Sequence, residues 1–310
     1  LYAESDQSRV IAVIGARGGV GASTIAHNLA WSIAERQDAC ASLIDLDLAF
    51  GAAGFSLGRA SKQSVADVLS AETISDANLA RAATQHTKRL QILAAPATLE
   101  RTAELDPSAV DALICHARRA NPFVVLDLPH AWNGGVRQAL AAADEVVLVA
   151  SPDLASLRNA KSLLDALTHL RKGKSDPFIA LSMVGAPKRP EISAKDFADA
   201  VGASPSACLA FDPLLYGLCE TKNQMIGEAD PESKTAAALD ALAALLTGRK
   251  ATPRKRAADP AILARDGAAD FAKSPRRSAH DAKPAANDNV LVLNHESSIG
   301  TLTAALNSDG

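Results

Sequence analysis

The chain has 310 residues, of which 48% are hydrophobic and 22% are charged, and its formal net charge is −3. These values are ordinary for a globular protein with one large or two modest domains, and the small net charge indicates neither nucleic acid nor a membrane as partner. Aromatic residues make up only 4% and no run of 18 apolar residues occurs, which disfavours an aromatic-rich all-β fold and a transmembrane helix.

The first elements in the chain are a strand, a glycine-rich loop and a helix. Residues 1–8 contain neither an initiator Met nor the apolar stretch of a signal peptide, and we expect them to be a leader or the remnant of a longer chain. The β-branched run Val10–Gly15 predicts a buried parallel strand. Ala22–Glu35 has apolar residues at helical spacing, with Ser23 and Thr24 near its start, and predicts a helix.

Strands and helices then alternate along the chain. Six more apolar runs are predicted to be strands: Ala41–Leu46, Leu90–Ala94, Phe123–Leu128, Glu145–Ala150, Phe178–Val184 and Ala207–Phe211. Helical patterns lie between most of them and after the last, most clearly at Pro107–Arg119, Leu154–Leu170 and Ser233–Leu246. We therefore predict an α/β domain over residues 9–248, built on a doubly wound, mostly parallel sheet with helices on both faces.

The composition changes after Gly248. Residues 249–283 contain ten Lys and Arg against four Asp and Glu, without sustained periodicity. We expect residues 249–310 to be a disordered tail rich in Ala, Pro and basic residues. An electrostatic contact of this tail with an acidic partner or a lipid surface is the alternative.

The segment 14–24, IGARGGVGAST, joins the first strand to the first helix. Backbone N–H groups at a helix N-terminus bind anions, and Gly18, Gly19 and Gly21 let the backbone approach phosphate oxygens without a Cβ in the way. Ser23 stands where the hydroxyl that binds Mg²⁺ is expected. The segment therefore predicts a phosphate-binding loop, with a glycine-rich turn that binds no ligand as the alternative.

The loop departs from the common pattern GxxxxGK[ST] at two positions, because Ala16 replaces the first glycine and Ala22 replaces the lysine. Carboxylates follow two of the predicted strands, Asp45 and Asp47 in DLD and Asp127 in DLP. Aspartates at strand ends are also common as caps and turn residues, so each of them alone is weak evidence for a metal or catalytic site.

Taken together, these motifs resemble the ParA/MinD family, whose deviant phosphate loop (deviant Walker A motif) is KGGxGK[ST], with Arg17 at the first lysine. DLD resembles the switch I segment of that family, and DLP resembles switch II (DxPxG) apart from Ala131 in place of glycine. The segment 143–158 resembles the family pattern ADxxxxVxxPxxxSxR. The resemblance implies a P-loop ATPase fold that uses ATP and Mg²⁺.

Longer stretches resemble one branch, the CpaE/TadZ pilus-assembly proteins: GARGGVGAST, DLDLAFGAAG, LAAPATLERT, VVLDLPHAWN, VGAPKRPEIS and FDPLLYG. The similarity runs from Ser8 to Gly248. It implies a cytoplasmic protein, found at the cell pole, that helps to place the Tad/Flp type IVb pilus machinery with its secretion ATPase. Many such proteins also carry an N-terminal receiver-like domain, and the sequence shows none, which supports the expectation of a truncated chain.

The resemblance also implies roles for individual residues. Nucleotide contacts are expected from Ala16, Arg17, Gly18, Gly19, Val20, Gly21, Ala22, Ser23 and Thr24. Ser23 and, through water, Asp127 would hold Mg²⁺. Asp47 would lie near the attacking water with Asp45 in support, and Arg17 would reach the partner's phosphates across a homodimer. These three form the expected catalytic set.

The base pocket differs from that of the relatives. Ser182 stands where they often have the Asn that recognises adenine, and a hydroxyl offers one donor rather than an amide pair. Pro187, Asp212 and Pro213 are expected to wall this pocket.

The missing lysine is expected to affect hydrolysis more than binding. A charge-assisted hydrogen bond contributes about 1.5–3 kcal/mol, and the backbone cradle and Mg²⁺ would remain. Fixed cations stabilise the charge of the transition state, so we expect binding of ATP, formation of a homodimer, and slow or absent hydrolysis.

Three alternatives stay open at this point. An active cycling ATPase of the MinD or DNA-partitioning type is one, although residues before 249 contain 22 Lys and Arg against 28 Asp and Glu, and Gly267 interrupts the poor amphipathic pattern Ala261–Lys273. We therefore expect no specific nucleic acid and only indirect membrane association. A scaffold that binds no nucleotide is the second. A reductase like the nitrogenase iron protein is the third, but it needs paired cysteines, and Cys115 has no second Cys at suitable spacing.

The four cysteines of the chain have no CxxC spacing and no histidine at metal-ligand spacing. We expect them to be small buried apolar residues in a reducing compartment. They are Cys40, Cys115, Cys208 and Cys219.

Overall fold

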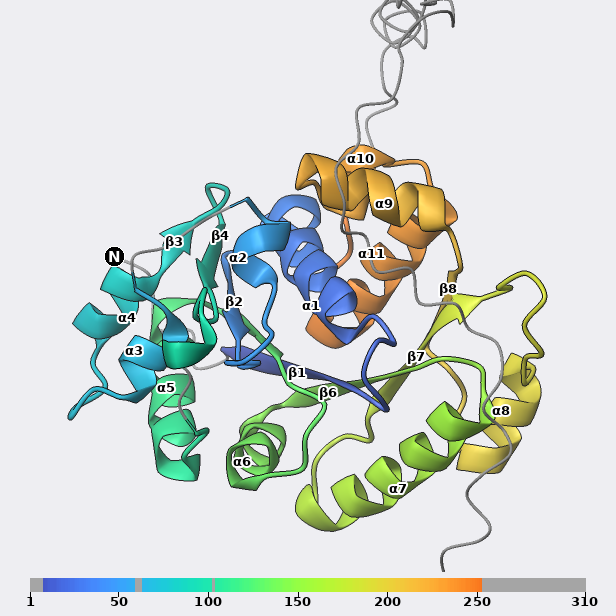
Figure 1. Ribbon diagram of the computed structural model, residues 1–310, viewed down its shortest axis with the longest axis horizontal. Coiled ribbons are helices and arrows are strands. Elements are labelled where there is room, and N and C mark those ends of the chain that lie inside the picture. Colours follow the sequence, from blue (N-terminus) through green and yellow to red (C-terminus); the bar gives the residue numbers. More distant parts are fainter. Residues whose placement is uncertain (1–7, 59–62, 102–103, 253–310) are drawn as a thin grey trace, which may run out of the picture. The chain divides into compact units, whose positions relative to one another are not determined.

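A computed structural model describes residues 8–58, 63–101 and 104–252. Eight strands of these residues form one sheet in the order β3-β4-β2-β5-β1-β6-β7-β8 (Figure 1). All neighbouring strands pair in parallel except β3 and β4, which are antiparallel. The strands are β1 (Arg9–Gly15), β2 (Ala41–Asp45), β3 (Thr84–Gln85), β4 (Leu90–Leu93), β5 (Phe123–Asp127), β6 (Glu145–Ala150), β7 (Phe178–Val184) and β8 (Ala207–Ala210).

Helices cover both faces of the sheet (Figure 1). Several of them begin at a polar side chain that accepts a hydrogen bond from the first turn, such as Asp106, Asn133, Asp153 and Ser233. The α-helices are α1 (Ala22–Trp31), α2 (Ala53–Ser56), α3 (Val65–Leu69), α4 (Asp76–Ala82), α5 (Pro107–Ala120), α6 (Gly134–Ala142), α7 (Leu154–Leu170), α8 (Ala194–Val201), α9 (Pro213–Lys222), α10 (Ile226–Ala229) and α11 (Lys234–Thr247).

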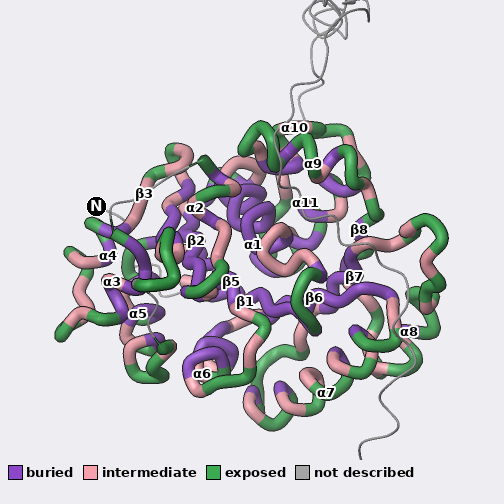
Figure 2. Tube along the Cα trace, in the orientation of Figure 1, coloured by how far each residue is buried: buried purple, intermediate pink, exposed green. Residues whose placement is uncertain are grey.

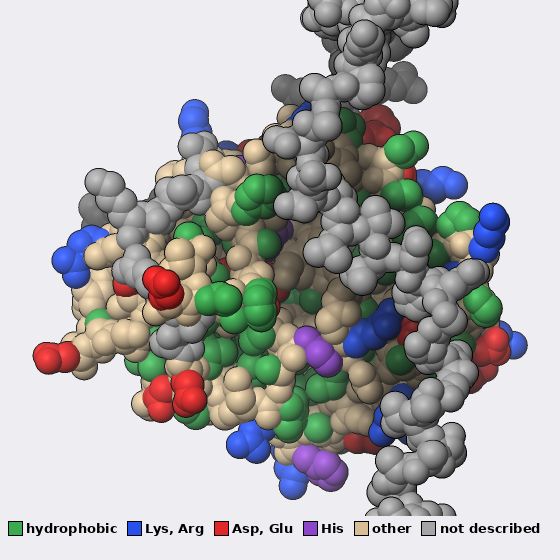
Figure 3. All heavy atoms as spheres, viewed as in Figure 1, with side chains coloured by type: hydrophobic (Ala, Val, Ile, Leu, Met, Phe, Trp, Pro, Cys, Tyr) green, Lys and Arg blue, Asp and Glu red, His purple; other side chains and the backbone are tan. Residues whose placement is uncertain are grey.

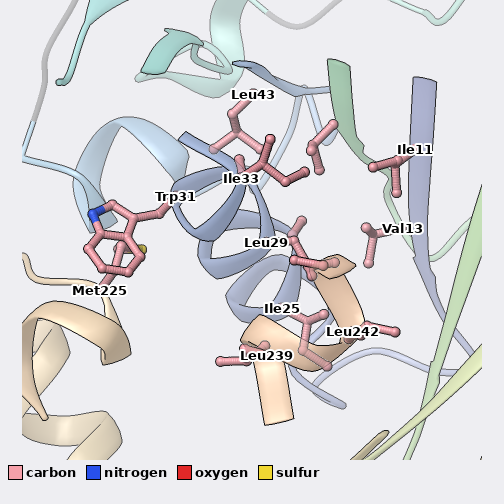
Figure 4. Packing of buried hydrophobic residues seen from close by; sticks show 14 of the residues in the cluster. Ile11, Val13, Ile25, Leu29, Trp31, Ile33, Leu43, Met225, Leu239 and Leu242 are labelled. Carbon is pink, nitrogen blue, oxygen red and sulfur yellow. The ribbon is translucent and has the colours of Figure 1, made fainter. Parts of the chain in front are cut away.

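The two faces of the sheet have separate hydrophobic cores. Along β1, Ile11 and Val13 belong to the core formed with α1 and α11, whereas the alternate residues face the core formed with α5, α6 and α7. Figure 4 shows the first core, with Leu29 of α1 beside Val13 and with Leu242 of α11 below. Because both faces are covered, the central strands are buried throughout (Figure 2). The predicted doubly wound α/β fold is confirmed.

Four details differ from the sequence-based expectations. The four cysteines were expected to be buried, but only Cys219 is, since Cys40 is half-buried and Cys115 and Cys208 are exposed. The predicted helix Ala22–Glu35 ends as an α-helix at Trp31 and continues as a π-helical turn over Ser32–Arg36. Here Ser32 Oγ donates a hydrogen bond to Asp240 Oδ1 of α11 at 2.7 Å. The short antiparallel strand β3 was not expected, and strand ends differ by one residue from the predicted ones, as is usual for element boundaries.

Most residues of the two predicted terminal segments, 1–8 and 249–310, lie outside the described ranges, as does Ala261–Lys273. Among the helices that the structure does describe, none has both the length and the apolar composition needed to cross a membrane.

The strand order brings the carboxyl ends of β1, β2 and β5 together. β1 pairs with β5 on one side and β6 on the other, with Val13 opposite Asp127. Asp45 at the end of β2 is also opposite Asp127 at the end of β5. The strand order therefore reverses beside β1. In sheets of this class, ligands bind at the carboxyl ends of the strands next to such a reversal.

Candidate nucleotide-binding site

The glycine loop between β1 and α1 has the backbone conformation that only glycine adopts easily. Gly19 and Gly21 have φ values of 78° and 83°, in the left-handed region, and Gly21 is the N-cap of α1. A Cβ placed on Gly18, Gly19 or Gly21 would meet no heavy atom within 4 Å. The backbone of this loop therefore borders open space at all three glycines.

The carbonyl groups of the loop are held from outside by three different elements. The carbonyl oxygen of Gly15 lies 3.0 Å from Nδ1 of His130, and that of Ala16 accepts a hydrogen bond from Asn159 Nδ2 at 2.9 Å. The carbonyl of Val20 accepts from Ser182 Oγ at 2.5 Å. The peptide groups of the loop are therefore fixed in orientation before any ligand binds.

The amide groups are in the opposite situation. Within the described residues, the N–H groups of Gly18 and Gly19 and of residues 21–24 donate to no protein acceptor, and the first intrahelical bond runs from Ile25 N to Gly21 O. Such N–H groups at the positive end of a helix dipole bind anions. The loop therefore fits a phosphate chain, even though Ala22 supplies no ammonium group.

The two predicted Mg²⁺ ligands come from different elements. Ser23 is half-buried on the first turn of α1, and Asp127 is fully buried at the end of β5. Neither carboxylate oxygen of Asp127 has a hydrogen-bond partner among the described residues, although Oδ2 lies 3.3 Å from Nε2 of His27. A buried carboxylate without a donor is suited to a cation or its bound water.

The two predicted switch I carboxylates have different surroundings. Asp45 is fully buried and accepts hydrogen bonds from the amides of Asp47 at 3.1 Å and Ala53 at 3.0 Å, so it holds the loop that follows β2. Burial, followed by the proximity of Asp127, raises the pKa of Asp45 to about 7. Asp47 is only half-buried and accepts from the amide of Phe50 at 3.0 Å. Asp47 is therefore the more accessible of the two.

Arg17 points to a neighbouring helix of its own chain. Its guanidinium NH2 lies 3.2 Å from Asp153 Oδ2, and its side chain is 43% exposed. Asp153 also caps α7 by accepting from the amide of Ser156 at 2.9 Å. Partial burial disfavours the charged form of Asp153, but hydrogen bonds from Ser151 and Ser156, together with the charge of Arg17, lower its pKa on balance.

Comparison with known proteins also indicates a phosphate-binding loop at this position. The model of a family described as "AAA domain" (AAA_31) matches residues 8–179, more than half of the chain. The chain belongs to this family. Within it the fold is that of the ParA/MinD-like P-loop ATPases: a ParA family ATPase from Chlorobium tepidum has a TM-score of 0.69 at 25% identity, over 76% of this chain and 98% of that one.

Two further relatives complete this picture of the ParA/MinD-like chain. The septum site-determining protein MinD from Pyrococcus horikoshii, solved with Mg-ADP, has a TM-score of 0.67 at 21% identity and covers 77% of this chain and 96% of that one. The uncharacterized protein Rv3660c of Mycobacterium tuberculosis is 32% identical over 208 residues, 66% of this chain and 55% of the relative. The chain thus spans about half the length of this curated relative.

The residues predicted around the base lie at the same edge of this ParA/MinD-like domain. Ser182 near the end of β7 is buried, and its hydroxyl donates a hydrogen bond to the Val20 carbonyl. Pro187 is exposed in the loop after β7, whereas Asp212 caps α9 by accepting from the Leu215 amide at 3.0 Å, with Pro213 as the first helical residue. A direct contact of Ser182 with a base stays a prediction.

Sequence reasoning missed three residues that shape the candidate site. His27 follows Ser23 by four residues and therefore lies on the same face of α1, a relation that the sequence does contain. Asn159 and His130 hold the loop through the carbonyls of Ala16 and Gly15. These contacts join residues more than 100 positions apart, and no local pattern marks them.

Proposed function

We propose that this protein binds ATP with Mg²⁺, dimerises around it, and hydrolyses it slowly or not at all. The strongest support comes from the hydrogen bonding of the phosphate loop. Side chains outside the loop donate to its carbonyl groups, while the amides of Gly18, Gly19 and residues 21–24 have no acceptor among the described residues. Membership of the ParA/MinD-like ATPase family points to the same ligand.

The proposed roles follow from the chemistry of each side chain. Ser23 and, through water, Asp127 would hold Mg²⁺, which neutralises phosphate charge when it is bound. Asp47, the accessible carboxylate of the switch I loop, would orient the attacking water. Asp45 would act indirectly, because it accepts hydrogen bonds from two amides of that loop and so fixes its conformation. Ala22 offers no charge at the position of the lysine, which is why we expect turnover to be slow.

Exposed apolar side chains around the site support a second copy as the partner. Phe50 and Phe55 after β2 are 79% and 68% exposed, and Trp132 after β5 and Leu154 after β6 are 45% and 76% exposed. All four follow carboxyl ends of strands, the edge that carries the phosphate loop. Figure 3 shows hydrophobic side chains gathered on this face of the molecule, and such patches mark interaction surfaces.

The test is an ATP titration combined with a mass measurement. Calorimetry with ATP and Mg²⁺ up to millimolar concentration is expected to show saturable binding, and light scattering is expected to show a doubled mass when ATP is present. Arg17→Ala is expected to weaken dimerisation more than binding to the monomer. The absence of saturable binding at millimolar ATP would contradict the proposal. If Arg17→Ala weakens ATP binding and dimerisation equally, Arg17 does not act across the dimer.

We further propose that the dimer serves as a localisation and assembly factor for Tad/Flp pili at the cell pole, with the secretion ATPase among its partners. This rests on the resemblance of segments such as 45–54 and 124–133 to the CpaE/TadZ proteins. The test is a fluorescent fusion in a cell that makes Tad pili, together with co-purification of the secretion ATPase. A diffuse signal and unchanged piliation after deletion would argue for another cellular role.

A cycling ATPase of the MinD or ParA type is the second candidate, because family membership favours it. A phosphate-release assay distinguishes the two candidates. A cycling ATPase is expected to hydrolyse ATP as the wild-type protein, whereas our proposal expects faster hydrolysis only in the Ala22→Lys variant. Sedimentation with anionic liposomes and with DNA, each with and without ATP, tests the expectation that membrane contact is indirect and that no specific nucleic acid binds.

A further inference from the structure

Three polar side chains from different elements meet in the interior, one helical turn below Ser23. They are His27 of α1, Asp45 of β2 and Asp127 of β5, and one potential ligand atom of each lies within 4.8 Å of the other two. The exposed fractions of these residues are 2%, 0% and 0%. The parallel register that places Asp45 opposite Asp127 brings the two carboxyl groups together.

The hydrogen bonding of this cluster is incomplete. Nε2 of His27 and both carboxylate oxygens of Asp127 have no hydrogen-bond partner among the described residues, although Nε2 lies 3.3 Å from Oδ2. Most buried polar side-chain atoms in proteins have a partner, and an unpaired one lowers stability. Asp45 uses two lone pairs for the amides of Asp47 and Ala53 and keeps others free.

We propose that His27, Asp45 and Asp127 bind a divalent first-row transition metal ion, with Zn²⁺ preferred to Mn²⁺ and both preferred to Mg²⁺. Imidazole nitrogens and carboxylate oxygens are both ligands of Zn²⁺, and zinc sites with an open position have three protein ligands. Imidazole is a poor ligand for Mg²⁺, and affinity along the first row rises from Mn²⁺ towards Zn²⁺. A divalent ion would also balance the two carboxyl groups that the fold removes from water.

This site shares Asp127 with the proposed Mg²⁺ position but takes its other two ligands from His27 and Asp45, and it needs no ATP. Ser23 and His27 lie four residues apart on one face of α1, with Ser23 nearer the phosphate loop. An ion held by His27 would therefore lie about one helical turn further from the loop than Ser23 and would also contact Asp127. Metal binding is accordingly measured without nucleotide, so failure of the ATP proposal leaves this test intact.

The experiment uses the full chain, stripped of metal and free of nucleotide. Cys115 and Cys208 are exposed thiols that would also bind Zn²⁺, so both are replaced by Ser throughout. Calorimetric titrations with ZnCl₂, MnCl₂ and MgCl₂ are expected to show one Zn²⁺ per chain and the affinity order Zn²⁺ > Mn²⁺ > Mg²⁺. No Zn²⁺ binding, or Mg²⁺ binding as tight as Zn²⁺, overturns the proposal.

A matched pair of variants locates the site. His27→Asn is expected to weaken Zn²⁺ binding more than about 100-fold, because changes even to outer partners of metal sites weaken binding about 10–100-fold. His116→Asn is the control, since His116 also forms a His–Asp pair, with Asp76, but on the surface. Equal losses in the two variants, or none in His27→Asn, rule out the buried site.

A spectroscopic measurement covers the case in which His27→Asn does not fold. Pulsed electron paramagnetic resonance of Mn²⁺ bound to the otherwise unchanged double-Ser protein detects a directly coordinated nitrogen. Nitrogen modulation from one imidazole is expected, and it should persist in His116→Asn. Bound Mn²⁺ with only oxygen ligands would overturn the assignment of His27.

Discussion

Arg17 and Asp153 form an ion pair within one chain, with 3.2 Å between guanidinium and carboxylate. Arg17 is the residue that we expect to reach across the dimer, so in the monomer Asp153 competes with the partner's phosphates for the same guanidinium. The pair is partly exposed, and such pairs contribute about 0–1 kcal/mol. Dimerisation therefore has to overcome only a weak contact.

The first prediction is that Asp153→Asn strengthens ATP-dependent dimerisation. Asn caps a helix about as well as Asp, so α7 is retained while the charge opposite Arg17 is lost. The dimer dissociation constant at saturating ATP, measured by analytical ultracentrifugation, is expected to fall about fivefold or less, which corresponds to the range of about 0–1 kcal/mol for the ion pair. Asp106→Asn caps α5 in the same way but has no Arg partner, and should leave the constant unchanged.

The second prediction concerns the support of the loop by Ser182. Ser182→Ala leaves the Val20 carbonyl without its donor, and an unsatisfied buried acceptor reduces the free energy of unfolding by about 1–3 kcal/mol. ATP binding should weaken as well, because the loop loses one anchor. Chemical denaturation and ATP titration check this. In Ser162→Ala an exposed hydroxyl loses its bond to the Arg158 carbonyl, and the change should stay within about 0.5 kcal/mol.

The third prediction concerns Gly51, which lies against the Asp45 carboxylate. A Cβ at Gly51 would be 2.4 Å from both carboxylate oxygens of Asp45, so the loop and the carboxylate would have to separate. Gly51→Ala is expected to lower the free energy of unfolding by about 1–3 kcal/mol. Gly217→Ala in α9 meets no atom within 4 Å and should raise it by about 0.5–1 kcal/mol. Equal effects of the two substitutions would contradict the close contact.

The fourth prediction is a dependence of stability on pH. The pKa of Asp45 is raised from 3.8 to about 7 in the folded chain, so the native state holds a proton that the unfolded state releases. This contribution is full below pH 3.8 and is lost as the pH rises towards about 7. Asp45→Asn cannot release the proton, so its free energy of unfolding relative to wild type should rise from pH 3.8 to about 7 and level off above.

Denaturation curves in EDTA at a series of pH values measure this difference. EDTA keeps metal binding from contributing to stability. A difference between wild type and Asp45→Asn that stays constant across the range would show that Asp45 titrates alike in the folded and unfolded chains.

The architecture was largely predictable because its signals are local. The apolar run Val10–Gly15, the glycines after it and the helical spacing from Ala22 are all readable within one segment, and the structure has the same strand, loop and helix there. The doubly wound, mostly parallel sheet followed from the alternation of strands and helices, whereas the order of the strands was not predicted and comes from the structure. The two-residue strand β3 was missed because so short a segment carries no periodicity.

Side-chain partners were less predictable because they depend on residues distant in sequence. Ser182 was expected to face a base, and the structure shows its hydroxyl occupied by a carbonyl 162 positions earlier. His27 occupies a position where the helix pattern only requires burial, and its proximity to Asp127 depends on how α1 lies on the sheet. Charge and spacing indicate which chemistry is available, whereas the pairing of groups is fixed by tertiary packing.

The three outside anchors of the phosphate loop have a consequence for the thermodynamics of ligand binding. A loop held by His130, Asn159 and Ser182 is rigid before nucleotide arrives, so little conformational entropy is lost on association. Such preorganisation would offset part of the affinity that is lost with the usual ammonium group. Ala22 at the position of the lysine therefore removes a charge but leaves in place the three hydrogen bonds that fix the backbone of the loop.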